Sequence, residues 1–450
     1  MRMLDRPLLP CSTISEPRRE DYVSLVSTDS YRLAIRELSD RLVTAQRPIR
    51  VLSAINWDDG IKQQFFDDGF TEQPRVDRAY YESRRLKLDP EATREELLHI
   101  EAEITSKLGP ASSAGALMRF MAQQFSLTVD MIEARGTDRF CEMSRLLYGT
   151  PSDVFHAGGP TVADLALTMR ETLEANSMAI MNMPDDRDIP GTEAVDRLRG
   201  QLAASVGPDR IVVKVDDAIA ADAAAGSDYI KMREDRFFSQ RDIDLLEAHE
   251  GWVHVSTTMN GLAQPVCTFL GKAAPRTTVT QEGLAVLTEM LSLRSHPLRL
   301  AKLMRRIDAI AMATDGASFL EVFNALRDEG LSEDDAWTTT SRVFRGSVPE
   351  GPPFTKDLGY GKGLILTLVY VRLAIRFGKT DRIPLLFCGK VDLLDMAALH
   401  DLYEEGLVER PEFVPPPFDD LPALATTLAL GRFTSQLDTE RLSHDFAHLF

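Results

Sequence analysis

One short stretch of the chain combines two histidines and a glutamate in a spacing that could hold a metal ion. His249 and Glu250 are adjacent, and His254 follows five positions after His249. Neutral imidazole is a common zinc ligand, and a carboxylate beside the metal can take a proton from an attacking water molecule. The stretch therefore indicates the chemistry of a zinc-dependent hydrolase. The alternative is that two unrelated histidines lie on an ordinary helix.

The spacing is one residue longer than in His-Glu-x-x-His, where the histidines lie four positions apart. On a regular α-helix, residues four apart point about 40° from each other, whereas residues five apart point about 140° from each other. The two rings can share a metal only if the helix is distorted between them. Gly251 relaxes the backbone directly after the glutamate, so we expect a π-bulge or a loosened turn between Glu250 and His254.

A third ligand could come from a helix that begins near Thr280. Glu282 lies in its first turn and would complete a set of two imidazoles and one carboxylate, for which one Zn²⁺ is the expected ion. Glu289 lies about two helical turns later, so it shares the face of Glu282 and could be an outer partner or an alternative ligand. In the other reading, Glu282 only stabilises the N-terminal end of its helix through the helix dipole.

The sequence around these residues resembles a known family. The segments HEGWVH, NGLAQP and TQEGLA are similar to the family with the flavohemoglobin expression-modulating QEGLA motif, whose animal relatives are the microtubule-associated tyrosine carboxypeptidases. The same likeness is carried by ARGTDRFCEMSRLLYG, RVFRG, FTKDLGYGKG and LFCGK. It extends over most of residues 25–450.

This resemblance implies a zinc metallopeptidase of the gluzincin type, in which a glutamate from a later helix completes the metal site. His249, His254 and Glu282 would hold the zinc ion, and Glu250 would be the general base. The animal relatives remove the last residue of the tubulin tail, and some relatives act on a C-terminal glutamate. The implied function is therefore a carboxypeptidase whose substrate is the C-terminus of a peptide or protein.

Two alternatives to this function stay open. One is a non-catalytic regulatory protein that keeps zinc for its structure. A free carboxylate at Glu250 argues against it, because a structural zinc site needs no base beside an open metal position. The other is a metal-dependent amidase that acts on a small peptide-like metabolite.

Residues farther along the chain could bind the substrate. A carboxypeptidase needs a cation for the terminal carboxylate, and Arg345 and Lys356 are the candidates, although each could be an ordinary surface charge. Tyr360 could donate a hydrogen bond to the oxyanion formed during the reaction. Asn260 could support the ligands from outside or organise the turn after the metal helix. Trp252 departs from the family pattern, and it could line a substrate subsite or pack in the core.

Charge and composition limit the classes of partner. The formal net charge of −18 argues against general binding to nucleic acids or anionic membranes, because both require a basic face. The same charge fits poorly with a polyacidic tubulin tail. The most apolar run, 364–371, is far shorter than the roughly 20 residues that span a bilayer. Four distant cysteines without a C-x-x-C pair indicate a reducing, cytoplasmic location.

A second histidine pair is a weaker metal candidate. His444 and His448 lie four positions apart, which places two imidazoles on one helical face. No glutamate follows the first histidine, and no third ligand is evident in the sequence. The pair also lies near the C-terminus, where helices fray.

The elements that position these residues are predicted to be mostly helices. Ser239 and Asp242 resemble a capping box, so the metal helix should begin near Gln240. Apolar residues recur at helical spacing in three earlier segments, 31–46, 95–108 and 116–134. Strands are expected at 49–57 and 211–217, where β-branched residues are enriched, and an Ala-rich helix is expected after the second of them.

The predicted fold class is α+β and predominantly helical, with a gluzincin-like zinc metallopeptidase core and a small sheet. Three parts are expected along the chain. They are an irregular arm at 1–24, a mainly helical subdomain at 25–175, and a catalytic domain at 176–450 that contains both motif helices. We expect the two larger parts to pack as one body.

Overall fold

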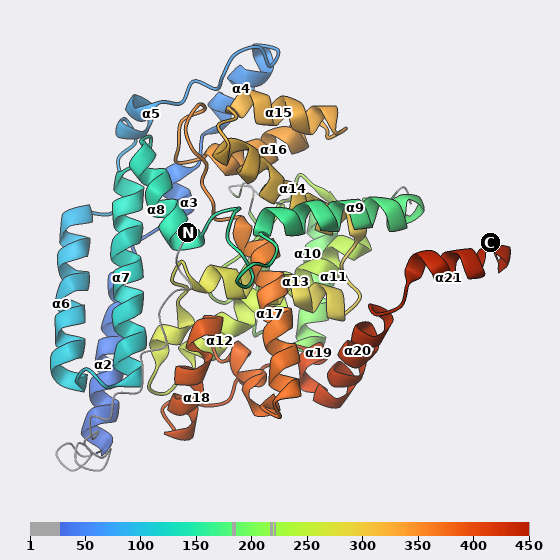
Figure 1. Ribbon diagram of the computed structural model, residues 1–450. Helices are drawn as coiled ribbons and strands as arrows, with labels where there is room; N and C mark the ends of the chain where they lie inside the picture. Colours follow the sequence, from blue (N-terminus) through green and yellow to red (C-terminus); the bar gives the residue numbers. More distant parts are fainter. Residues whose placement is uncertain (1–27, 182–185, 217–218, 220–221, 450) are drawn as a thin grey trace.

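The fold is built mainly of helices (Figure 1), and the described residues also form one three-stranded and one two-stranded sheet. The computed structural model describes residues 28–181, 186–216, 219 and 222–449, so the whole of the predicted arm at 1–24 lies outside the described residues. The predicted class, α+β and predominantly helical, is confirmed.

Three long helices lie side by side at one end of the molecule, on the left of Figure 1. They are α2 (Thr28–Ala45), α6 (Pro90–Leu108) and α7 (Ser113–Glu133), and they confirm the helices predicted at 31–46, 95–108 and 116–134. Each buries an apolar stripe against the others, which is the periodicity that the sequence shows.

The strand predicted at 49–57 is wrong. The segment forms the short helix α3 (Val51–Ile55), which packs against α7. Among its residues only Ile55 is buried, and Leu52 is 41% exposed. A strand gains stability from a neighbouring strand, and the packing of one apolar residue against α7 overrides the β preference of Val and Ile here.

The centre of the molecule is a pair of helices in backbone contact, α13 (Thr277–Leu291) and α17 (Leu358–Arg376). A Cβ atom added to Gly283 would lie 2.0 Å from the carbonyl carbon of Gly363, and one added to Gly363 would lie 1.9 Å from the Val279 carbonyl oxygen. Both glycines are therefore required for the close approach. This contact brings Glu282 next to the beginning of α17.

The apolar character of α17 extends beyond the predicted run at 364–371. This 19-residue helix is long and apolar enough to cross a membrane, judged by length and composition. It packs against α13, α9 (Val162–Met181), α14 (Pro297–Thr314) and α20 (Leu421–Thr434). Those contacts are typical of a central core helix, which is also apolar on most sides.

A three-stranded sheet lies beside α10 (Gly191–Ser205). Its order is β2-β4-β3, with β2 (Val212–Val215) parallel and β3 (Ala223–Ala225) antiparallel to β4 (Tyr229–Met232). The strand predicted at 211–217 is confirmed. The Ala-rich helix predicted after it is wrong over β3, because pairing with β4 outweighs the helix preference of alanine.

The remaining elements surround this framework. Strands β1 (Ile189–Pro190) and β5 (Phe237–Phe238) form a separate antiparallel pair. The other α-helices are α4 (Asp59–Asp67), α5 (Arg78–Glu82), α8 (Asp138–Tyr148), α11 (Gln240–Leu246), α12 (Ser256–Leu262), α15 (Phe319–Asp328), α16 (Glu333–Phe344), α18 (Met396–Glu404), α19 (Pro416–Asp419) and α21 (Thr439–Asp445). Short 3₁₀-helices are η2 (Thr268–Gly271), η3 (Thr380–Arg382), η4 (Pro384–Phe387), η5 (Leu393–Asp395) and η6 (Ala447–Leu449).

Buried apolar residues form one large cluster and two smaller ones. The large cluster contains residues from both sides of position 175, from Ile35 to Leu424. A second cluster joins the three-stranded sheet to α10 and to the segment around Trp252, and a third surrounds Phe140 and Phe354. The division into subdomains at 25–175 and 176–450 stays a prediction.

Substituting alanine for Gly283 tests the contact between α13 and α17. We expect Gly283→Ala to lower the free energy of unfolding by about 1–3 kcal/mol, because the added methyl group overlaps the backbone of α17. Denaturant unfolding measures this change. Gly200→Ala is the control, since nothing lies within 4 Å of its Cβ position on α10, and it should stabilise the chain by about 0.5–1 kcal/mol. Wild-type stability of Gly283→Ala would contradict the close packing.

Candidate metal centre

The helix that carries both histidines changes its geometry at the site. Helix α11 begins at Gln240 behind the predicted capping box of Ser239 and Asp242. It continues into the nine-residue π-helix η1 (Glu247–Val255) and then into α12. In a π-helix the hydrogen bonds join residues five apart, so His249 and His254 lie on one face. The predicted distortion is confirmed, and it extends over more of the helix than a single bulge.

Three consecutive hydroxyl groups stabilise the wide turns from the C-terminal side. A π-turn leaves its carbonyl groups less evenly paired than an α-turn, and side-chain hydroxyls can bond to them. Each donates to a carbonyl of η1: Ser256 to Gly251 (2.8 Å), Thr257 to Val253 (2.5 Å) and Thr258 to His254 (2.8 Å). The Ser-Thr-Thr run was a sequence signal for this geometry that the spacing argument missed.

Gly251 and Trp252 fix the back of the π-helix against α10. A Cβ atom on Gly251 would lie 2.3 Å from Leu202 Cδ2, so the glycine permits a close approach between helices as well as a relaxed backbone. Trp252 is 4% exposed, and its Nε1 donates to Ser205 Oγ at 2.9 Å. The Arg294 guanidinium lies 4.3 Å from the centre of the tryptophan ring. Trp252 therefore packs in the core.

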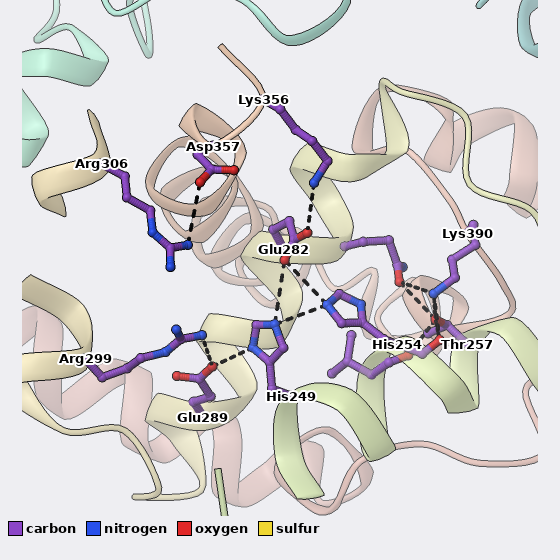
Figure 2. Close-up of polar contacts among 12 residues, drawn as sticks. His249, His254, Thr257, Glu282, Glu289, Arg299, Arg306, Lys356, Asp357 and Lys390 are labelled. Carbon is purple, nitrogen blue, oxygen red and sulfur yellow. Dashed lines mark hydrogen bonds and ion pairs between the residues drawn. The ribbon is translucent and has the colours of Figure 1, made fainter. Parts of the chain in front are cut away.

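The structure brings His249, His254 and Glu282 together, with their donor atoms facing one another (Figure 2). The two Nε2 atoms are 3.2 Å apart, and Glu282 Oε2 lies 3.7 Å from that of His249 and 3.5 Å from that of His254. Donor atoms around a tetrahedral zinc ion lie roughly 3.3 Å apart. Glu282 Oε2 is buried without a hydrogen-bond partner in the described chain. These residues fit a metal ion.

Glu289 holds His249 from the opposite side of the ring. Its Oε1 lies 2.5 Å from Nδ1 of His249 and 3.3 Å from Nη2 of Arg299. A carboxylate on the outer nitrogen fixes the ring orientation and directs the other nitrogen toward a metal. Glu289 therefore lies outside the three candidate ligands and contacts one of them, His249. This is one of the two roles that the sequence left open.

The charges around His249 favour the positively charged form of its imidazole. Burial disfavours a charged imidazole, yet the carboxylates of Glu282 and Glu289 raise the pKa of His249 to about 10. Burial also disfavours the charged form of Glu282, but Lys356 and the two histidines lower the pKa of that carboxyl well below its usual range. An ionised carboxylate facing two imidazoles is the electrostatic environment that a divalent cation requires.

Glu250 lies on the π-helix between the two histidines and is only partly buried. Within the described chain, its carboxylate takes part in no hydrogen bond or ion pair. Burial lowers the pKa of His249, but Glu282 and Glu289 raise it, and Glu250 is close enough to add a smaller effect in the same direction. The carboxylate is therefore available for proton transfer beside the candidate ligands.

Lys356 and Tyr360 reach the site from the beginning of α17. Lys356 Nζ lies 3.6 Å from Glu282 Oε1, on the side away from the histidines (Figure 2). The Tyr360 ring is nearly parallel to that of His249, with 6.5 Å between the ring centres. Burial and the negative charge of Glu282 raise the pKa of Tyr360, so its hydroxyl keeps its proton. The structure brings both residues to the site.

Arg345 is placed differently from Lys356. Its side chain is buried, its Nη1 donates to Asn56 Oδ1 at 3.4 Å, and its guanidinium lies 5.7 Å from the centre of the Phe354 ring. It makes no hydrogen bond or ion pair with the three candidate ligands in the described chain. Its predicted role in substrate binding stays a prediction.

Two arginines that sequence reasoning missed surround Asp357. Arg342 binds this carboxylate through Nε and Nη2, at 2.6 and 3.0 Å, and Arg306 Nη1 lies 3.7 Å from it. Burial would raise the pKa of Asp357, but the two guanidinium groups hold it well below its usual range. Burial lowers the pKa of Arg306 and of Arg345 to about 10, and the charge of Arg342 adds to this effect. Positive charge therefore exceeds negative charge around Asp357.

Asn260 organises the chain after the metal helix. Its Nδ2 donates to the carbonyl oxygens of Phe387, at 2.9 Å, and Phe413, at 2.8 Å. Gln264 bonds in a similar way to the backbone of Glu409. These contacts tie α12 to two later loops, so the structure supports the turn-organising role of Asn260. None of its hydrogen bonds within the described chain reaches a candidate ligand.

The described part of the chain holds no second group of three metal-compatible side chains. The pair His444 and His448 therefore gains no third ligand there.

Comparison with known proteins places this site within a family. Among curated proteins, no sequence matches the chain. A family model described as microtubule-associated tyrosine carboxypeptidase matches residues 63–436, which include all the candidate ligands and the cations around them. Because the match covers most of the chain, the protein belongs to the family of microtubule-associated tyrosine carboxypeptidases.

Proposed function

We propose that the chain is a zinc-dependent carboxypeptidase of the gluzincin type, with one ion held by His249, His254 and Glu282. The observation that carries the proposal is the convergence of these three donor atoms, one of which is a buried carboxylate oxygen without a hydrogen-bond partner in the described chain. Two imidazoles and one carboxylate suit zinc and leave a position for water. Membership in the family supports the carboxypeptidase reaction.

The residues of the chain can be assigned roles in peptide hydrolysis. When bound, the metal ion would acidify a water molecule and polarise the carbonyl group of the scissile bond. Glu250 would accept the proton from the attacking water and deliver it to the leaving amine nitrogen. Because its carboxylate makes no hydrogen bond among the described residues, both oxygens are free for this transfer. Tyr360, whose hydroxyl stays protonated, would donate a hydrogen bond to the developing oxyanion.

The cations beside the site support recognition of a C-terminal carboxylate. Lys356 lies next to the outer oxygen of Glu282, and Arg306 and Arg342 share one buried carboxylate at Asp357, whose charge also acts on Arg345. A carboxylate bound here would balance the excess positive charge through charge-assisted hydrogen bonds. This charge distribution favours a substrate with a free C-terminus over a neutral amide.

The cysteines support the cytoplasmic location that we propose for the protein. Cys141, Cys267 and Cys388 are buried and unpaired. Burial raises the pKa of each thiol, to about 11 for Cys141 and about 12 for the other two, so these thiols are poorly reactive. Buried free thiols fit a reducing compartment.

Metal analysis of purified variants tests the three ligands. We expect the wild-type chain to contain stoichiometric zinc and His249→Ala or Glu282→Ala to lose most of it, because each change removes one of three donors. Mass spectrometry of the metal content gives the result. His156→Ala is the control, since this exposed residue lies on a loop outside the site. Unchanged zinc in His249→Ala and Glu282→Ala would rule the site out.

Substitution of Glu250 separates metal binding from catalysis. Glu250→Gln keeps the size of the side chain but removes its basicity, so zinc content should stay at the wild-type level. Turnover should fall roughly a hundredfold to ten-thousandfold, the usual contribution of general acid–base catalysis. Peptide cleavage and metal content are measured on the same preparation. Wild-type turnover of Glu250→Gln would remove this residue from the mechanism.

Peptides with free and amidated C-termini test the type of cleavage. We expect release of the last residue from peptides with a free C-terminus, and at least a tenfold lower kcat/KM for the amidated forms, because a lost charged hydrogen bond costs about 1.5–3 kcal/mol. Mass spectrometry of the products identifies the bond that is cut. Equal cleavage of both forms would favour an amidase or endopeptidase.

A further inference from the structure

A buried lysine lies directly behind His254, and the proposed reaction gives it no role. Lys390 is 9% exposed, and its Nζ donates three hydrogen bonds. The acceptors are the His254 carbonyl oxygen at 2.7 Å, Thr257 Oγ1 at 3.0 Å and Gln281 Oε1 at 2.9 Å (Figure 2). All three donors of the ammonium group are therefore used, which is the condition under which a charged side chain can be buried.

The three acceptors come from the two segments that carry the metal ligands. His254 is itself a candidate ligand, and Thr257 follows it by one helical turn. Gln281 precedes Glu282 on α13. Thr257 Oγ1 also lies 2.9 Å from Gln281 Oε1, which closes a ring of contacts with Lys390. These contacts link the π-helix to α13 at the point where both present a donor atom to the metal.

Lys390 is itself fixed by a third segment. Its backbone nitrogen donates to the Leu270 carbonyl oxygen at 2.6 Å. A Cβ atom on the preceding Gly389 would lie 2.5 Å from the same oxygen, so only glycine permits this approach. The lysine therefore extends from a backbone that is fixed by its contact with Leu270.

Electrostatics and geometry make opposite predictions for how the removal of Lys390 would change zinc affinity. Burial lowers the pKa of Lys390 to about 7, although the carboxylates of Glu282 and Glu250 act in the opposite direction and raise it. A positive charge beside a cation site weakens cation binding, so charge alone predicts tighter zinc binding when the lysine is removed. If the hydrogen bonds hold the ligands in place, its removal weakens binding instead.

We propose that Lys390 is a positioning residue, whose three hydrogen bonds lock the π-helix with His254 against the helix with Glu282 and keep these two ligands at binding distance. The inference rests on the proposed metal site. It concerns how the ligand set is held, and it assigns Lys390 no contact with substrate.

Zinc affinity tests the positioning role of Lys390. The full-length wild type, Lys390→Met, Gln281→Leu and the double variant are stripped of metal and titrated with Zn²⁺ against a chelator. Outer-shell substitutions typically cost about 10–100-fold in metal affinity, and we expect each single variant to lose that much. The double variant should lose little more than the worse single variant, because both changes break one linked set of contacts. Lys302→Met, at the ion pair with Asp335 on the surface of α14, should bind as the wild type does.

A spectrum provides a readout that general destabilisation would not change. Co²⁺ in a four-coordinate site absorbs visible light strongly, and this absorption falls when a ligand moves away. We expect Lys390→Met to lose intensity under conditions in which circular dichroism shows that the metal-free variant is folded. If Lys390→Met does not fold, Gln281→Leu carries the same expectation, because it removes the oxygen through which Lys390 bonds to the helix with Glu282.

The outcomes separate this inference from the proposed function. Equal or tighter zinc binding by Lys390→Met, with an unchanged cobalt spectrum, would overturn the positioning role. If His254→Ala still abolishes zinc binding, the proposed metal site would stand. A wild-type chain that binds no zinc, or a His254→Ala variant that binds it as the wild type does, would instead overturn both the metal site and the positioning role of Lys390.

Discussion

The nine-residue π-helix is the constraint on which the site depends, because His249 and His254 face one point only while its wide turns persist. Isolated π-helices are rare, so the surrounding chain must stabilise this one. Hydroxyl groups of residues 256–258 bond to its carbonyls on one side. On the other side, Gly251 allows Leu202 of α10 to pack directly against the backbone. The distortion is thus supported by side chains on both sides of the π-helix.

The position of Glu282, the third candidate ligand, depends on a second close contact. Gly283 lies against Gly363, so α13 and α17 meet backbone to backbone, and the residue before Gly283 is Glu282. The same contact brings the N-terminal end of α17 beside the ligands, which is why Tyr360 lies near His249. A helix pair held apart by larger side chains would separate the carboxylate from the imidazoles. Packing of small residues thereby sets the electrostatics of the site.

The parts of the site that the sequence could predict are those governed by local spacing. The five-residue separation of His249 and His254 predicted a π-bulge or a loosened turn if both bind one metal, and the helical period put Glu289 on the face of Glu282. Contacts between distant segments left no such pattern: Lys390 lies 136 positions from His254. The wrong strand at 49–57 has a related cause, because local preference decides secondary structure only where tertiary packing is neutral.

Net charge is a poor guide to what such a site can bind. The chain carries −18 overall, which argued against a polyacidic substrate. Yet Arg306 and Arg342 share the single carboxylate of Asp357, and Lys356 lies next to the candidate ligand Glu282. Charges at the surface are screened within about 10 Å at ordinary ionic strength, whereas buried charges are screened much less. A substrate entering the site therefore meets the buried cations rather than the average of the chain, and acidity of the protein gives no reason to exclude acidic C-termini.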